Sequence, residues 1–206
     1  MTWPPPAPRS SEHPGHAVIE AEIKARVHDV QAVRDLLRAR AAEQVSDYHD
    51  TYYDLPGQVL TSEGRELRVR VIETGERRRC LLTCKGAAVD EQTGSKPETE
   101  TEITDPGAMD QILLALGFTR LVAFDKHCVN YAFTASGHRM LATLVTVPEL
   151  DGTFIEVETM TSGRDDLGAA LVGIRAVLGQ LGIAESDLTT EQYTDAVMRH
   201  RSVSGP

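Results

Sequence analysis

The sequence predicts an α+β fold, a closed antiparallel eight-stranded β-barrel with helices packed outside. Segment after segment alternates charged and apolar residues, as strands with one polar face do. These segments mostly follow one another along the chain, which favours antiparallel pairing, and amphipathic helical segments are available to cover the apolar faces. Eight antiparallel strands can close into a barrel that is wide enough to hold a small ligand.

The first expected strand covers residues 18–26, VIEAEIKAR. One face of this strand would carry Val18, Glu20, Glu22, Lys24 and Arg26, and the other would carry only Ile and Ala. Two carboxylates followed by two cations suit a solvated face. They also suit a site that holds metal ions beside an anion.

The other elements follow from the same periodicities and from turn residues. Apolar residues at helical spacing predict a first helix with Asp29 as its N-cap, and Pro106 and Gly117 fit the two ends of the next one. The expected strands after the first cover residues 47–55, 65–73, 77–86, 97–103, 126–133, 138–147 and 152–160. The expected helices cover residues 29–43, 105–117, 164–182 and 189–200.

Length and composition narrow the function. The 206 residues fit one domain, over residues 17–200, with disordered tails at 1–16 and 201–206. A formal net charge of −10 argues against binding to nucleic acid or to a membrane surface, and no apolar run is long enough to span a bilayer. Three cysteines and an N-terminus without a hydrophobic signal core predict a reduced, cytoplasmic protein.

Charged residues gather on one face of several later strands. Such faces are Glu66, Arg68 and Arg70; Arg79, Thr83 and Lys85; Glu98, Glu100 and Glu102; and Glu156 with Glu158. If helices cover the apolar faces, the charges point into the barrel, where desolvation makes them a poor source of stability but a plausible binding tunnel. Acids could hold divalent cations, and Arg and Lys could hold phosphate oxygens. An open sheet with solvated cross-strand ion pairs is the alternative.

The elements EAEIK, DTYYD, LRVR, LTCK, PETETEI, FDK and FIEVE, in this order, resemble the CYTH superfamily. The resemblance covers residues 18–182. It is closest to the class IV adenylyl cyclase branch and more distant to the thiamine triphosphatases and inorganic triphosphatases. It implies a triphosphate tunnel, an eight-stranded barrel that binds organic or inorganic triphosphates with Mg²⁺ or Mn²⁺.

The resemblance also implies roles for single residues, although it identifies no catalytic residue. The implied metal ligands are Glu20, Glu22, Glu156 and Glu158, and the implied phosphate-binding residues are Lys24, Arg68, Arg70, Lys85 and Lys126. Glu98 and Glu100 match further acids of the family. The implied activity is conversion of ATP to cyclic AMP and pyrophosphate. Hydrolysis of a triphosphate or diphosphate, or binding of a phosphate ligand without turnover, are the alternatives, and a homodimer is left open.

Two positions depart from the family pattern. Cys128 stands where the family has an Arg, and Thr146 stands where counting back from the last acidic strand places an Asp. Asp151 could take the place of that Asp if the loop were shifted. A thiol cannot neutralise phosphate, and a hydroxyl is a poor replacement for a carboxylate ligand. We therefore expect one cation and one carboxylate fewer than in the family, and weak activity on ATP or a changed substrate.

Overall fold

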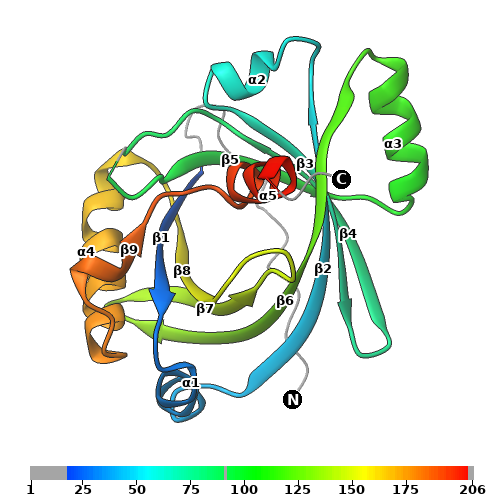
Figure 1. Ribbon diagram of the computed structural model, residues 1–206. Helices are drawn as coiled ribbons and strands as arrows, with labels where there is room; N and C mark the ends of the chain where they lie inside the picture. The colour runs from blue at the N-terminus through cyan, green and yellow to red at the C-terminus, as the bar shows by residue number, and fades with distance from the viewer. Residues whose placement is uncertain (1–17, 91, 204–206) are drawn as a thin grey trace.

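The computed structural model describes residues 18–90 and 92–203; the tail expected over 1–16 lies outside the described residues. Eight strands form a closed antiparallel barrel, in which β5 returns to pair with β1. Around the barrel the order is β1 (Ile19–Val27), β8 (Thr153–Thr161), β7 (His138–Thr146), β6 (Thr119–Ala135), β2 (Glu43–Asp54), β3 (Glu66–Thr74), β4 (Arg77–Lys85) and β5 (Lys96–Glu102). Figure 1 looks along this barrel. The predicted fold class is confirmed.

The barrel closes unevenly on the two sides of β1. Nine residue pairs join β1 to β8, from Ile19 opposite Thr161 to Val27 opposite Thr153. Only two pairs join β1 to β5, and one of these sets Glu20 opposite Lys96. The short ninth strand, β9 (Leu188–Thr189), pairs with β1 farther along. We call the two-pair contact between β1 and β5 the seam.

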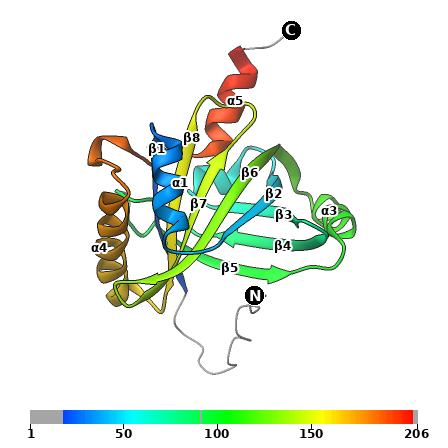
Figure 2. The ribbon, with the colours of Figure 1, turned by 90° about the horizontal axis from the view of Figure 1, so that it is seen from below.

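The apolar face of β1 points outward and is covered by helices. Ala21, Ile23 and Ala25 are almost fully buried in a core shared with α4 (Arg164–Gln180) and α1 (Val30–Arg38). Both helices lie outside the barrel wall in Figures 1 and 2. Because neighbouring side chains of a strand alternate, the charged face of β1 must line the interior. The solvated open sheet is thereby ruled out.

Close packing of α4 depends on one glycine. A Cβ added at Gly173 would lie 2.9 Å from Cβ of Ser136 and 3.1 Å from Cε of Met140. Ser136 belongs to the turn between β6 and β7, so the absent side chain lets the helix lie directly against this hairpin.

The remaining helices lie at the ends and edges of the barrel. α3 (Pro106–Ala115) buries Leu113 against Val69 of β3, and α2 (Val59–Ser62) follows β2. α5 (Tyr193–Val203) stands at one mouth of the barrel, as Figure 2 shows from the side. Its buried residues Tyr193 and Val197 pack with apolar side chains of β6, β7 and β8. The C-terminal helix therefore covers part of one mouth.

Several boundaries differ from the predicted ones. The first helix ends at Arg38, and β2 begins at Glu43, because the Glu43 carboxylate receives hydrogen bonds from Arg34 and Arg38 and holds the chain in an extended path. β6 begins at Thr119, seven residues before the predicted strand. Neither α2 nor β9 was predicted.

The last helix also differs from its prediction. α5 starts at Tyr193 and runs to Val203, three residues into the segment expected to be a tail. Arg201 fixes this end, since its Nε donates to Oε2 of Glu149 over 2.6 Å. Among the described residues, no helix is both long and apolar enough to cross a membrane.

Candidate functional site

The structure brings all nine predicted site residues into the barrel interior. Each lies on the inward face of its strand: Glu20, Glu22 and Lys24 on β1, Arg68 and Arg70 on β3, Lys85 on β4, Lys126 on β6, and Glu156 and Glu158 on β8. Most are buried. Inside, they divide into an acidic group and a basic group.

The acidic group consists of Glu20, Glu22 and Glu158. Carboxylate oxygens of the three side chains lie within 4.8 Å of one another, and Glu22 stands directly opposite Glu158 in the β1–β8 register. Burial and the neighbouring carboxylates of Glu156 and Glu20 raise the pKa of Glu22 to about 7. Burial, Glu20 and Glu22 raise the pKa of Glu158 well above its usual range. Crowded, desolvated carboxylates of this kind fit a hard divalent cation, which would neutralise them.

Lys85 contacts the acidic group, although it was predicted to bind phosphate. Its Nζ pairs with Glu20 and lies 3.9 Å from Glu22 and 3.4 Å from Glu98. Burial alone would lower the pKa of Lys85, but these three carboxylates raise it well above its usual range. The acids of β1 therefore have a basic partner that comes from β4, across the seam.

The basic group is Lys24, Arg68, Arg70 and Lys126, and Glu156 lies among it. Burial would raise the pKa of Glu156, yet Lys126, Lys24 and Arg70 lower it. Glu156 is not part of the close carboxylate cluster. The four predicted metal ligands therefore divide into a cluster of three and one residue that faces the cations.

Asp50 is an interior residue to which the sequence assigned no role, although it lies within the quoted DTYYD element. Nε and Nη2 of Arg70 donate to its two carboxylate oxygens over 2.6 Å each, and Nζ of Lys126 lies 4.0 Å away. Burial opposes the charged form, but the nearby Arg70, Arg68 and Lys126 hold the pKa of Asp50 well below its usual range. Strand alternation could have identified it, since Tyr48, Asp50 and Tyr52 share one face of β2.

Two buried polar atoms lack a partner among the described residues. They are Nε of Arg68 and the hydroxyl oxygen of Tyr193. Arg68 uses Nη2 to donate to Oγ1 of Thr83 over 3.3 Å, which leaves Nε available to an acceptor. A buried donor without a partner is costly. Its presence among Lys and Arg side chains fits an anion that binds inside the barrel.

Tyr193 of α5 covers two of the cations. Its ring centroid lies 4.4 Å from Nζ of Lys24 and 4.2 Å from Nζ of Lys126. Lys24 also donates to the backbone oxygen of Glu191, just before the helix, and burial lowers the pKa of Lys24. Nothing in the local sequence pattern could place a helix residue against two distant strands.

The two departures from the family pattern have different positions. Cys128 is 1% exposed on the inner face of β6, and burial raises the pKa of its thiol to about 12, so it is neutral. It packs with Val145 and Phe154. Thr146 is exposed on the outer face of β7, opposite His127, so the prediction that it takes the place of a metal ligand is wrong. Its neighbour Val145 faces the interior instead.

Asp151 does not fill the supposed vacancy. It is exposed in the connection between β7 and β8, where its backbone oxygen accepts a hydrogen bond from Arg26. Cys128 places no charge in the interior, as expected from the sequence. Asp50 of β2, like Glu156, is a carboxylate that faces the interior cations.

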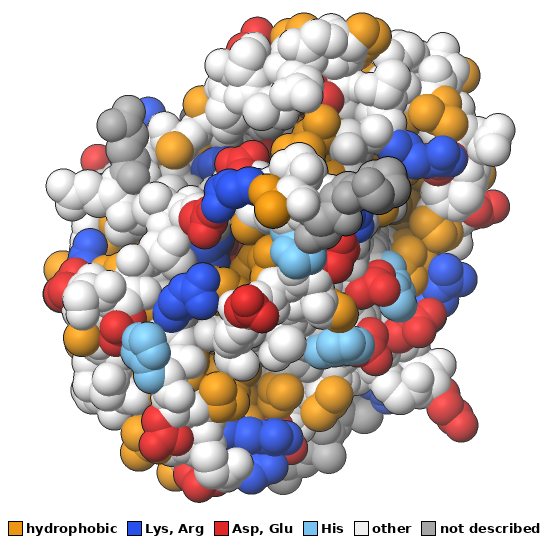
Figure 3. All heavy atoms as spheres, in the orientation of Figure 1, with side chains coloured by type: hydrophobic (Ala, Val, Ile, Leu, Met, Phe, Trp, Pro, Cys, Tyr) orange, Lys and Arg blue, Asp and Glu red, His pale blue; other side chains and the backbone are white. Residues whose placement is uncertain are grey.

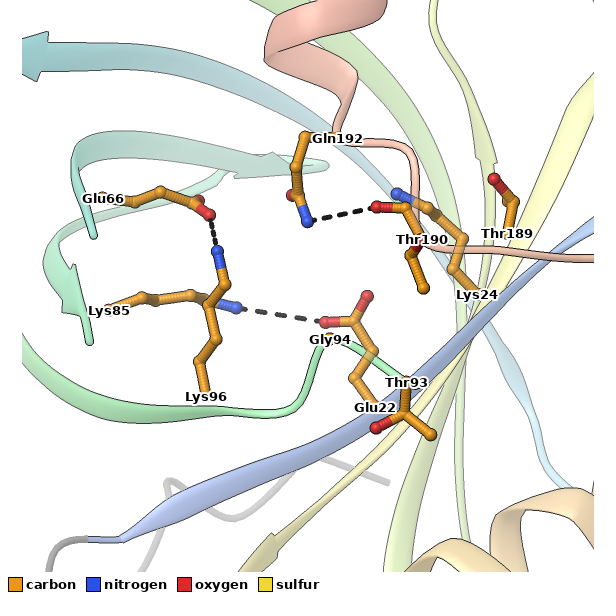
Figure 4. Close-up of a pocket in the computed structure, with 10 residues that line it drawn as sticks. All are labelled: Glu22, Lys24, Glu66, Lys85, Thr93, Gly94, Lys96, Thr189, Thr190 and Gln192. Carbon is orange, nitrogen blue, oxygen red and sulfur yellow. Dashed lines mark hydrogen bonds and ion pairs between the residues drawn. The ribbon is translucent and has the colours of Figure 1, made fainter. Parts of the chain in front are cut away.

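The interior opens at a mouth between β1, the loop before β5 and the segment before α5. Figure 4 shows Glu22 and Lys85 pointing toward each other, and Lys96 paired with Glu66 beside them. Gln192 overhangs the mouth from the start of α5. Both acidic and basic side chains are therefore reachable from one opening.

Known proteins share this sequence and architecture. Residues 18–193 match the family model described as CYTH domain. Adenylate cyclase CyaB of Aeromonas hydrophila is 27% identical over 179 residues, which cover 84% of this chain and 86% of that protein. A putative adenylate cyclase of Methanocaldococcus jannaschii is 24% identical and covers 86% of this chain and 98% of its own.

Solved structures agree with the sequence comparison. The PH1819 protein of Pyrococcus horikoshii superposes with a TM-score of 0.78 and 26% identity, over 88% of this chain and 99% of that one. A Hippeastrum protein, described as a putative adenylyl cyclase with a dominant triphosphatase activity, has a TM-score of 0.60 and 16% identity, over 88% and 95% of the two chains. The barrel, the charged interior and the match over residues 18–193 together show that the chain belongs to the CYTH domain family.

Proposed function

We propose that the protein is a divalent-metal-dependent enzyme that acts on a nucleoside triphosphate inside the barrel, as an adenylyl cyclase. The observation that carries the proposal is the meeting of a three-carboxylate cluster with buried cations, one of which has an unpartnered donor, Nε of Arg68. Members of the CYTH family act on small phosphate substrates and use divalent metals. Two relatives are named adenylate cyclases, which supports the cyclase assignment.

Each group in the interior would have a separate task. Glu20, Glu22 and Glu158 would hold Mg²⁺ or Mn²⁺, which neutralises phosphate charge and orients the phosphate oxygens when it is bound. Arg68 and Arg70 would donate to phosphate oxygens, and Asp50 holds the Arg70 guanidinium in one orientation. Lys24 and Lys126 supply further positive charge on the wall that Tyr193 covers.

The cyclase reaction joins the ribose to its own phosphate. The 3′-oxygen forms a bond to the α-phosphorus, the bond from that phosphorus to the bridging oxygen breaks, and pyrophosphate leaves with the electron pair. The hydroxyl proton is released at the same time. Alignment of the phosphate chain by fixed cations is the main contribution that such a site can make.

Hydrolysis of a triphosphate is the second candidate. Here water attacks a phosphorus atom, and the leaving phosphate takes the bonding electrons. The Hippeastrum neighbour, with its dominant triphosphatase activity, supports this alternative. The neutral thiol of Cys128 also favours it, since a site with one cation fewer would hold an organic triphosphate less firmly in the arrangement needed for ring closure. Binding without turnover is the third possibility.

The same reasoning extends to partners and location. Basic and acidic side chains are interspersed on the face shown in Figure 3, so that face offers no single-sign patch to a polyanion. We therefore propose that the partner is a small organic phosphate. We also propose that the protein is cytoplasmic, since Cys80, Cys84 and Cys128 are free thiols. A homodimer remains a prediction to be measured by light scattering.

Product analysis distinguishes the three possibilities. The protein would be incubated with ATP, thiamine triphosphate or inorganic tripolyphosphate, each with Mg²⁺ and with Mn²⁺, and the products identified by mass spectrometry. Cyclic AMP and pyrophosphate would establish the cyclase; ADP or AMP with phosphate or pyrophosphate would establish hydrolysis. Binding in calorimetry without any product would establish a binder.

Glu22→Gln should abolish the metal-dependent product, and absence of binding to all three compounds would refute the proposal.

A further inference from the structure

Two histidines and three carboxylates gather on the outer face of β2 and of the strands on either side of it. We call this set the outer cluster: Asp47 and His49 of β2, Glu73 of β3, and Asp125 and His127 of β6. The register sets Asp47 opposite both His127 and Glu73, and it sets His49 opposite Asp125. Because side chains alternate along a strand, the outer cluster lies on the opposite side of the barrel wall from the tunnel.

The outer cluster is open to solvent. The exposed fraction of its side chains runs from 45% for His49 to 62% for His127. Ion pairs between side chains as exposed as these contribute little to stability, so stability is a weak reason to collect five titratable groups on one surface. Imidazole and carboxylate together are, however, the ligands that proteins offer to zinc.

The ring of His49 is oriented as metal-binding histidines are. Its Nδ1 lies 2.8 Å from Oδ1 of Asp125, and its Nε2 lies 3.8 Å from Oε2 of Glu73. Since a carboxylate accepts, Nδ1 carries the proton of the neutral ring, and Nε2 keeps its lone pair on the side of Glu73. The 3.8 Å separation fits two atoms that each lie about 2.0–2.2 Å from one zinc ion. A carboxylate behind a ligating ring is a recurrent means of orienting it.

Asp47 can supply a third ligand. It stands directly opposite Glu73 and two residues before His49 on the same face, so the three side chains occupy adjacent positions on the sheet. Its Oδ1 lies 2.5 Å from Nδ1 of His127, which holds the carboxylate in place as Asp125 holds the ring of His49. Glu73 meets Arg78 through its other oxygen, Oε1, over 3.8 Å, so Oε2 stays directed at His49.

We propose that the outer cluster binds a divalent transition-metal ion of the zinc class, with His49, Glu73 and Asp47 as ligands and with Asp125 and His127 as the groups that orient them. An imidazole ligand favours such ions over Mg²⁺, and the affinity of mixed nitrogen and oxygen sites rises from Mn²⁺ to Zn²⁺. The site is separate from the tunnel, so it does not depend on the proposed function. A bound ion would tie β2 to β3.

The test measures Zn²⁺ binding to the full-length protein by calorimetry in excess Mg²⁺, which competes for the tunnel carboxylates. His49→Gln should weaken one Zn²⁺ site by about tenfold or more, a loss of about 1.4 kcal/mol. His28→Gln is the matched control, because His28 is also exposed and lies 3.2 Å from a carboxylate, that of Asp187. Asp125→Ala removes no ligand and should still weaken the site by about tenfold or more.

Two further variants separate the outer cluster from the tunnel. Glu73→Gln should weaken Zn²⁺ binding and leave Mn²⁺ binding in the tunnel unchanged, whereas Glu22→Gln should leave the outer Zn²⁺ site intact. The substituted side chains of the outer cluster are exposed, so folding should be unaffected. In ¹⁵N spectra of histidine rings, Zn²⁺ should shift Nε2 of His49, a signal assigned by its loss in His49→Gln. Zn²⁺ binding that is lost in Glu22→Gln but kept in His49→Gln would overturn the inference, as would an unchanged His49 signal.

Discussion

Carboxylates that lie in the acidic group and carboxylates that lie beside the basic group have pKa values shifted in opposite directions. In the acidic group, Glu22 and Glu158 have raised pKa values, because their carboxylates crowd one another away from water. Beside the basic group, Asp50 and Glu156 also lie away from water, yet neighbouring cations lower their pKa values. The basic group satisfies its acids from within the protein. Among the described residues, Lys85 is the cation that forms ion pairs with the acidic group, and a bound cation would correct the remaining excess of negative charge.

The largest effect on stability should come from removal of Asp50, the buried carboxylate that pairs with Arg70 of the basic group. Asp50→Ala would leave Arg70 and Lys126 without their carboxylate in the interior. Loss of one partner of a buried pair costs about 3–5 kcal/mol in the free energy of unfolding. Urea unfolding would measure it, and the double variant Asp50→Leu with Arg70→Met should recover most of the loss. A cost below about 1 kcal/mol would mean that the pair is solvated like a surface pair.

Removal of one carboxylate from the acidic group should raise stability, whereas removal of Asp50 lowers it. Glu22→Gln removes one of three crowded carboxylates, so the metal-free protein should become more stable. Affinity for Mn²⁺ should fall by at least about tenfold, as calorimetry in the presence of a triphosphate would show. Glu73→Gln, on the exposed outer face of β3, is the control. A destabilised variant with unchanged Mn²⁺ affinity would contradict the assignment of Glu22.

Phosphate affinity should depend on the unpartnered donor of the basic group. Arg68→Met removes Nε and the charge, and loss of a charge-assisted hydrogen bond costs about 1.5–3 kcal/mol, or about tenfold in affinity or more. Tripolyphosphate binding would be measured by calorimetry, with Arg164→Met on the outer surface of α4 as the matched control. If both variants bound like the parent, the interior cations would have no role in anion binding.

The two groups should also give opposite pH dependences of stability. The folded pKa of Glu22 is about 7 against an ordinary value of 4.5, so the folded metal-free protein binds the extra proton and loses stability as pH rises from about 4.5 to 7. The pKa of Asp50 is lowered, so its stabilising contribution is present above its ordinary value of 3.8 and is lost as pH falls below it. Thermal unfolding in chelator should therefore show greater stability near pH 5 than at pH 8. Mn²⁺ should reduce the difference, and a flat profile would contradict the raised pKa of Glu22.

The smallest effect belongs to Thr146. Because its side chain lies on the outer face, Thr146→Asp should change Mn²⁺ affinity by less than about twofold. Cys128→Arg, by contrast, adds a cation to the interior and should raise affinity for a triphosphate. An increase in metal affinity on Thr146→Asp would show that the side chain reaches the interior after all.

Much of this arrangement was predictable from alternation and from the order of the motifs. Alternation placed eight of the nine site residues on charged faces, and the family resemblance added Lys126; the closed barrel follows once helices cover the other faces. The same rule could have corrected Thr146, which shares the face of Ala142 and Leu144, two residues buried in the outer core. Counting along the sequence alone ignored the direction of the side chain.

Other parts of the site depend on contacts between distant segments. The pairing of Lys85 with Glu20 needs the barrel to close between β4, β5 and β1, which no local pattern specifies. The position of Tyr193 needs α5 to fold back over the mouth, and its anchor is a pair between Arg201 and Glu149. These contacts are tertiary, so periodicity within one element could not reveal them.

The two-pair seam gives the wall of the barrel a preferred line of opening. β1 is held to β8 by nine residue pairs and to β5 by two, so a local fluctuation separates β5 from β1 at far lower free energy than it separates β8. The amide proton of Glu98, which donates to the backbone oxygen of Val18, should therefore exchange with deuterium well before those at the centre of β8. The ion pair between Lys85 and Glu20 crosses the same line. A metal ion that displaced Lys85 from the carboxylates would loosen the wall at the moment when a bulky ligand enters. The tunnel would then be able to widen when the metal ion is bound and would be held narrower by the ion pair when it is absent.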